Sequence, residues 1–306
     1  MLTRYAVKVV VQLVLVVGGV STALFLLLRL SGDPAATMAG PAASPQIIAA
    51  LRQQMGLNDP LWIQYFRFLE NALRLDFGNS YRFTAPALPL VLARMPATLL
   101  LATSVVSVSI LIGFPAGIWS AVRPESIAAR LIYGLSYAAQ AIPGFWLALL
   151  LIIVFAVRLR WLPSFGAETP AQLLLPTLTL APLLIARITL MLNDSVRRVL
   201  NEDYVRTARA KGLLPRHVLA RHIIRNALIP VVTLIGIEFA HLSGGAVITE
   251  VIYSWPGVGS FLVEGVLARD YAIVQACVFV IALVVMVINL GVELSYGLLD
   301  PRIRTT

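Results

Sequence analysis

Residues Asp203 to Pro230 read DYVRTARAKGLLPRHVLARHIIRNALIP, a basic stretch between two long apolar runs. The stretch holds six Lys or Arg residues, and membrane loops of this charge stay on the cytoplasmic side. The pattern predicts a short helix from Tyr204 to Lys211 with Asp203 as its N-cap. Gly212 would end that helix in a left-handed conformation, and Pro215 suits the first turn of a second helix. We therefore expect two short helices that meet at a cytoplasmic elbow.

The first of these helices has the form of a docking element. Ala208 and Ala210 keep it thin enough to lie in a groove of another protein. Arg206, Arg209 and Lys211 surround it with positive charge. The segment therefore predicts contact with a cytoplasmic partner.

The composition indicates a polytopic membrane protein. Of the 306 residues, 59% are hydrophobic and 13% are charged, and the mean hydropathy is +0.86. The net charge of +9 needs no nucleic acid to explain it, because membrane proteins gather Lys and Arg on their cytoplasmic side. The single cysteine, Cys277, lies in an apolar run and cannot form an intrachain disulfide.

Six apolar runs are long enough to cross a bilayer, which takes about 20 residues. The first is too long for the core of a cleaved signal peptide and is expected to be an uncleaved span. The six runs are Val9 to Leu30, Pro96 to Val122, Leu131 to Val157, Leu173 to Leu192, Ala227 to Val251 and Ile273 to Leu294.

The distribution of basic residues predicts that both termini are cytoplasmic. With the N-terminus inside, 14 of the 24 Lys and Arg residues lie in the cytoplasm, and the short outer connections hold few. The basic residues that fix this orientation include Arg4, Lys8, Arg123, Arg130, Arg302 and Arg304.

Residues 31–95, between the first two spans, form the one segment that looks soluble. Pro45 to Met55 and Pro60 to Leu75 have amphipathic helical spacing, so we expect an extracytoplasmic helical insert. It is either a scaffold on the outer membrane surface or a part that contacts substrate. The predicted organisation is thus an N-terminal tail and first span (1–30), the insert (31–95), and a five-span core (96–306) with a cytoplasmic loop at 198–226.

The basic stretch resembles one known family. Asp203 to Gly212, followed by Arg225 to Pro230, is similar to the peptide and nickel branch of the ABC-importer permeases. Ala208 and Gly212 match the Glu-Ala-Ala-x-x-x-Gly frame of such permeases, whereas Arg206 and Thr207 replace its Glu and first Ala. The resemblance implies a coupling helix that docks on an ATPase through Asp203, Tyr204, Arg206, Thr207, Ala208, Arg209, Ala210, Lys211 and Gly212.

The resemblance also implies the partners and the function. It implies an inner-membrane permease subunit of an ATP-driven importer, in contact with lipid and paired with a second, related permease. Two cytoplasmic ATPase subunits would bind ATP and Mg²⁺, and an extracytoplasmic binding protein would deliver the solute. Peptides, glutathione-like solutes and nickel chelates remain alternatives for that solute.

Ionisable and amide side chains within spans are costly and are therefore candidates for the translocation path. We expect Arg187, Asn193, Glu238 and His241 to line that path, and Asn289 and Glu293 are further candidates. The alternative is that these side chains join neighbouring helices or extend to the membrane surface. The resemblance implies arginines at the positions of Leu190 and Asn193, so Arg187 marks a departure from the family pattern.

No enzymatic or metal-binding pattern is present in the sequence. A Gly-Lys-Ser/Thr phosphate loop, a His-Glu-x-x-His pair and a Gly-x-Ser-x-Gly turn are all missing. We therefore expect no catalytic site, cofactor or metal in this chain. A stand-alone secondary transporter is the alternative from another class, but Glu238 would be its only central acid.

Overall fold

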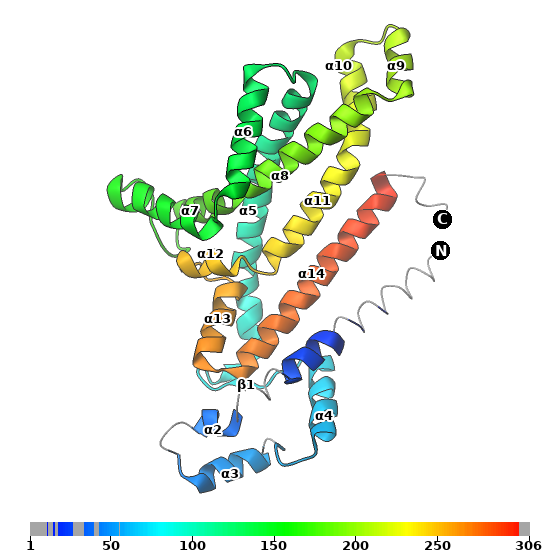
Figure 1. Cartoon of the computed structure of the whole chain (residues 1–306). Helices are drawn as coiled ribbons and strands as arrows, with labels where there is room; N and C mark the ends of the chain where they lie inside the picture. The colour runs from blue at the N-terminus through cyan, green and yellow to red at the C-terminus, as the bar shows by residue number, and fades with distance from the viewer. Residues whose placement is uncertain are drawn as a thin grey trace. The chain divides into compact units, whose positions relative to one another are not determined.

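The computed structural model describes residues 11, 15, 18–26, 34–39, 43–54 and 56–299, and these residues are mostly helical (Figure 1). The chain divides into two compact units. Unit 1 comprises Met1–Thr98 and Pro256–Met286, and unit 2 comprises Leu99–Trp255 and Val287–Thr306. The helical class agrees with the sequence prediction.

Unit 1 contains the predicted insert as three helices, namely α2 (Pro34–Ala39), α3 (Pro45–Gln54) and α4 (Leu61–Leu73). The last two lie where the amphipathic spacing placed them. The Gln64 side chain donates hydrogen bonds to two backbone carbonyl oxygens in the turn before α4. The side of the membrane on which these helices lie stays a prediction.

The first predicted span, Val9 to Leu30, lies largely outside the described residues. Within it, residues 11, 15 and 18–26 are helical. The Thr22 and Tyr65 hydroxyl oxygens are 2.7 Å apart, and the Phe25 and Tyr65 ring centroids are 5.4 Å apart. Residues 18–26 therefore pack against α4. The basic residues near both termini also lie outside the described part of the chain.

A small hairpin in unit 1 was not expected from the sequence. Strands β1 (Asn79–Ser80) and β2 (Ala85–Pro86) pair antiparallel. The Ser80 hydroxyl donates to the carboxylate of Asp270, which is buried just after α13 (Val258–Ala268). The hairpin therefore fixes the turn that follows α13.

Unit 2 contains most of the predicted permease core. Its α5–α6 turn lies at the same end as α9 and α10, and α7 and α12 lie away from that end (Figure 1). α5 (Ala87–Val122) enters unit 2 after Thr98, and α14 (Tyr271–Leu299) enters it at Val287. The other elements are α6 (Ile127–Ala141), α7 (Gly144–Leu151), the π-helical η1 (Ile152–Arg158), the 3₁₀ turn η2 (Pro170–Leu173), α8 (Leu174–Leu200), α9 (Asp203–Ala210), α10 (Pro215–His217), the π-helical η3 (Val218–Ile224), α11 (Arg225–Ser243) and α12 (Val247–Ile252).

The predicted span from Leu131 to Val157 is not one straight helix. α6 and the α7–η1 helix are bent by 101° at the break between them. The break falls at Pro143, which has no backbone N–H to donate, and Ile142 before it is extended, as residues preceding proline prefer. Length and apolarity alone do not show this bend, whereas Pro143 and Gly144 indicate a break in helical regularity.

The fifth predicted span, Ala227 to Val251, is also interrupted. α11 ends at Ser243, Gly245 has a φ of +103°, and α12 begins two residues later. Among the described residues, four helices are long and apolar enough to cross a membrane, or five if the bent α6 and α7–η1 pair is one span. The six-span count therefore stays a prediction.

A hydrophobic core cluster of unit 2 contains Tyr253, which follows the last residue of α12. Its hydroxyl lies 2.9 Å from the Thr179 hydroxyl of α8 and donates to the Ala148 carbonyl of α7. Burial raises the pKa of the Tyr253 phenol, and the hydrogen bond with Thr179 acts in the opposite direction. These contacts hold the bent segment α7 against α8.

Candidate coupling elbow and membrane-embedded polar site

The coupling elbow, residues 203–217, comprises α9, the turn after it and α10. α9 begins at Asp203, one residue earlier than predicted, and its N-cap is Glu202. The prediction that Asp203 caps the helix is therefore wrong. The N-cap residue Glu202 makes no side-chain capping hydrogen bond. Asp203 instead lies in the first turn, where its charge complements the helix dipole, and it pairs with Arg206 at 3.6 Å.

The end of α9 agrees with the prediction in detail. Gly212 has a φ of +74°, in the left-handed region. Its N–H donates to the Arg209 carbonyl, and the Leu213 N–H donates to the Ala208 carbonyl. These two bonds form a Schellman motif, which satisfies the last carbonyls of the helix. Pro215 then occupies the first turn of α10, as predicted.

The two faces of α9 differ. Val205 and Ala208 lie three residues apart and are buried against the rest of unit 2, with Ala208 only 6% exposed. Ala208 therefore lies on the apolar inner face of α9, and its part in docking stays a prediction. The remaining predicted docking residues are exposed, namely Asp203, Tyr204, Arg206, Thr207, Arg209, Ala210, Lys211 and Gly212.

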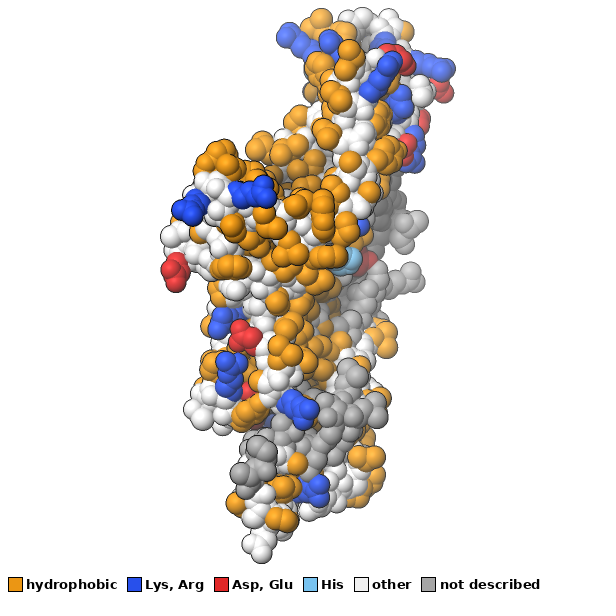
Figure 2. Space-filling model, turned by 60° about the vertical axis from the view of Figure 1, so that its left-hand side comes forward, with side chains coloured by type: hydrophobic (Ala, Val, Ile, Leu, Met, Phe, Trp, Pro, Cys, Tyr) orange, Lys and Arg blue, Asp and Glu red, His pale blue; other side chains and the backbone are white. Residues whose placement is uncertain are grey.

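Two exposed leucines at the elbow were missed by the sequence analysis. Leu213 is 39% exposed and Leu214 is 59% exposed, next to the basic side chains of Arg209 and Lys211. Figure 2 shows Lys and Arg side chains gathered over the end of unit 2 that carries α9 and α10. The sequence feature that could have revealed them is a pair of adjacent leucines inside a basic loop, because a turn that faces only solvent does not need apolar side chains.

The elbow is joined back to the helix that follows it. The side-chain amide of Asn226 on α11 donates to the Tyr204 hydroxyl of α9 at 3.0 Å. Val218 and Ile223 of η3, which lies between α10 and α11 in the chain, are buried. α9 is therefore connected to α8 by the chain and to α11 by this contact.

The structure brings together two of the polar residues that were predicted within spans. Arg187 of α8 forms an ion pair with Glu238 of α11, through Nη1 and Oε1. The Arg187 side chain is 41% exposed and that of Glu238 is 15% exposed. His241, three residues after Glu238 on α11, is exposed.

Asn193 has a different environment. It is 4% exposed, accepts a hydrogen bond from the Tyr133 hydroxyl of α6 and donates one to the Ser120 hydroxyl of α5, both at 2.8 Å. Asn193 thus connects three helices of unit 2. On α14, Asn289 is exposed and Glu293 is partly buried.

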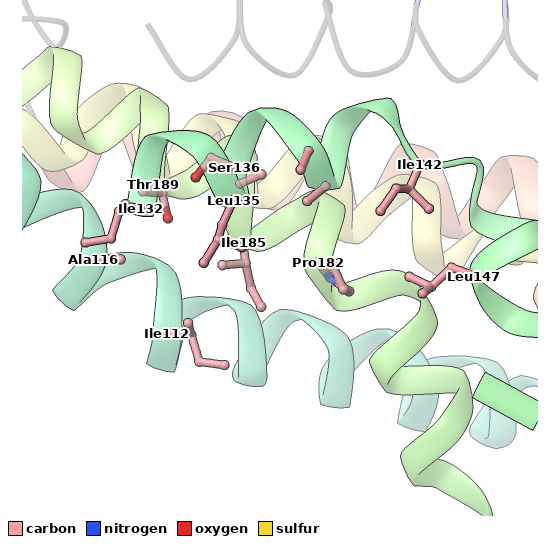
Figure 3. Close-up of a pocket in the computed structure, with 13 residues that line it drawn as sticks. Ile112, Ala116, Ile132, Leu135, Ser136, Ile142, Leu147, Pro182, Ile185 and Thr189 are labelled. Carbon is pink, nitrogen blue, oxygen red and sulfur yellow. The ribbon is translucent and has the colours of Figure 1, made fainter. Parts of the chain in front are cut away.

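An apolar pocket of about 410 Å³ lies on another side of α8 (Figure 3). The residues that line it include Ile112 of α5, Leu135 of α6, and Ile185 and Thr189 of α8. Carbon dominates the lining, so the pocket offers a polar solute few hydrogen-bonding partners. In the part of the chain that the structure describes, no group of three or more His, Cys, Asp or Glu residues could hold a metal ion.

Comparison with known families identifies the class of protein. Residues 113–305 match the family described as binding-protein-dependent transport system inner membrane component, and residues 1–102 match the companion family for the N-terminal part. The chain belongs to this family. It is a permease subunit of an ABC importer, a multi-pass inner-membrane component that is not itself catalytic.

Two curated relatives match almost the full chain. The chain is 38% identical over 309 residues to the probable peptide ABC transporter permease protein y4tP of Sinorhizobium fredii. It is also 38% identical over 302 residues to the glutathione transport system permease protein GsiC of Escherichia coli K12. In both cases the match covers 98% of this chain and 99% of the relative.

Two solved structures share the fold at low sequence identity. The inward-facing MetNI methionine ABC transporter aligns with a TM-score of 0.54 and 17% identity, over 69% of this chain and 96% of the other. An amino acid ABC transporter solved with histidines aligns with a TM-score of 0.51 and 16% identity, over 70% and 94%.

Proposed function

We propose that this permease imports peptides or peptide-like solutes and that its coupling elbow docks on a cytoplasmic ATPase subunit. The docking assignment rests on the exposed elbow between α8 and α11. Both of these helices are long and apolar enough to span a membrane. Arg206, Arg209 and Lys211 supply its charge, and Leu213 and Leu214 supply apolar anchors. A charged rim around an apolar centre is the usual composition of a protein interface.

The ATPase subunits bind ATP and Mg²⁺, and their closure moves the elbow. A second, related permease completes the transmembrane pair, and an extracytoplasmic binding protein delivers the solute. Support for these partners comes from the family, in which transport depends on a binding protein. Glutathione-like solutes belong to the same class of cargo, and a nickel chelate is the alternative cargo.

The elbow faces the cytoplasm, and both termini lie on that side. Support comes from unit 2, in which the α5–α6 turn and the elbow lie at one end. Arg123 and Arg130 flank that turn, and most basic residues between 197 and 225 flank the elbow. Basic residues of two separate connections at one end favour a cytoplasmic location for both.

The translocation path runs along the face of unit 2 that carries Arg187, Glu238 and His241. Charged and polar side chains within spans are retained where they meet water or solute. Asn193 was predicted for the path as well, but its two buried hydrogen bonds favour a role in joining helices. His241→Ala is therefore expected to change the uptake rate and to leave assembly of the complex intact.

The docking assignment is tested by copurification. Leu214→Ala should reduce the amount of ATPase that copurifies with the permease, because it removes an exposed anchor and leaves the core of unit 2 unchanged. Leu111→Ala is the matched control, since Leu111 is 75% exposed on the apolar helix α5. Equal ATPase recovery from both variants contradicts the docking assignment.

ATP-driven uptake of dialanine and of glutathione by the complete complex in proteoliposomes tests the substrate class.

A further inference from the structure

Arg187 uses only part of its hydrogen-bonding capacity. Its Nη1 atom pairs with Glu238, and among the described residues the guanidinium has no other partner. The side chain is 41% exposed although it lies on an apolar helix. We propose that the free edge of Arg187, formed by Nε and Nη2, binds a carboxylate group of the transported solute. This inference rests on the proposed path along α8 and α11.

Helix packing alone does not account for the pair. Removing two charges from water costs energy that their attraction often fails to return, and apolar residues of similar size commonly pack as well. The cost is greater within a membrane. An Arg–Glu pair between two spans therefore indicates that a charged group is needed at this point.

The faces of α8 beside Arg187 are apolar. Ile185 and Thr189 line the apolar pocket, and Ile188 packs against α5. Arg187 is the only basic residue of α8 before Arg197, near the helix end. An anionic solute group beside the middle of α8 therefore has one cationic partner on this helix.

The geometry of the pair suits a site that must also release its ligand. A guanidinium presents parallel N–H groups along each edge and binds a carboxylate through two bonds. Glu238 already engages Nη1, which orients the planar group and places a negative charge beside the incoming carboxylate. The repulsion between the two carboxylates lowers the affinity. A transport site needs such moderate affinity, because the solute must leave as readily as it enters.

The test uses the complete complex of two permeases and two ATPases in lipid nanodiscs without the binding protein. Equilibrium binding of the dipeptide dialanine is compared with that of dialanine amide, which lacks the carboxylate. The wild-type complex should prefer dialanine by about tenfold, the ratio that corresponds to one charge-assisted hydrogen bond. Glu238→Gln should increase this preference, because it removes the competing carboxylate.

Two double variants distinguish a role of the ion pair in solute binding from a role in holding α8 and α11 together. Arg187→Gln with Glu238→Gln removes both charges and should abolish the preference. Arg187→Glu with Glu238→Arg rebuilds an ion pair with the charges exchanged, and it should also lose the preference because the cation has left α8. The matched control replaces the exposed pair Glu70 and Arg74 of α4 by glutamines and should retain the preference.

Two results would overturn the inference. One is equal binding of the two probes by the wild-type complex, which requires no variant to fold. The other is a wild-type preference for dialanine in the charge-exchanged variant, which would show that the ion pair only joins the two helices.

The uptake assay keeps the two proposals distinct. If ATP drives no uptake of dialanine or glutathione, the proposed function fails, whereas uptake without discrimination against the amide contradicts only the role of Arg187.

Discussion

A Cβ atom at Gly117 of α5 would lie 2.9 Å from the backbone carbonyl oxygen of Thr189 on α8. The two helices therefore touch through backbone, and Gly117→Ala should force them apart at a cost of about 1–3 kcal/mol. The measurement is the melting temperature of the purified complex, which should fall. Gly134→Ala is the control, because nothing lies within 4 Å of the added atom on α6. Equal melting temperatures for the two variants would show that α5 and α8 are not packed this closely.

The left-handed turn at Gly212 leads to a second prediction. No atom lies within 4 Å of a Cβ at this position, so a substitution acts through backbone conformation alone. At a φ of +74°, Gly212→Val should strain the Schellman turn by roughly 1–2 kcal/mol and displace the elbow, whereas Gly212→Asn should be tolerated. ATPase copurification and coupled ATP hydrolysis should fall in the valine variant only. Wild-type coupling in Gly212→Val would contradict the role of α9.

Local features of the fold could be predicted because neighbouring residues determine them. The end of α9 follows from Gly212, and the start of α10 follows from Pro215. The insert helices α3 and α4 follow from amphipathic spacing. The one-residue error at Asp203 arose because two adjacent acids, Glu202 and Asp203, could each precede the helix.

Features that depend on distant residues could not be predicted. The partner of Arg187 is 51 residues away on α11, and no local pattern joins the two positions. The contacts of Asn193 with α5 and α6 could not be predicted, because burial between helices and exposure to a cavity require the same polar side chain. Pro143 and Gly144 indicate a break in helical regularity, but the size of the bend could not be predicted because both arms are apolar and the total length suits one span.

The orientation in the membrane is tested by cysteine labelling. A cysteine at Asn79, in the exposed hairpin, should react with an impermeant thiol reagent added to intact cells. A cysteine at Pro215 should react only after the membrane is opened, and more readily when ATPases are absent, because the elbow is then uncovered. The native Cys277 is fully buried and should add little background. The reverse labelling pattern would overturn the assignment of the elbow to the cytoplasm.

Asn193 gives the last prediction, which separates helix packing from a role in the path. Asn193→Leu keeps a similar volume but leaves the Tyr133 hydroxyl without its acceptor and removes the donor to Ser120. Burying an unpaired hydroxyl should destabilise the permease by about 1–3 kcal/mol and lower its melting temperature. Asn289→Leu on α14 is the control, because that side chain is exposed and its loss should leave the melting temperature nearly unchanged. Uptake per assembled complex should stay at the wild-type level in Asn193→Leu. An unchanged melting temperature together with altered uptake would instead return Asn193 to the translocation path.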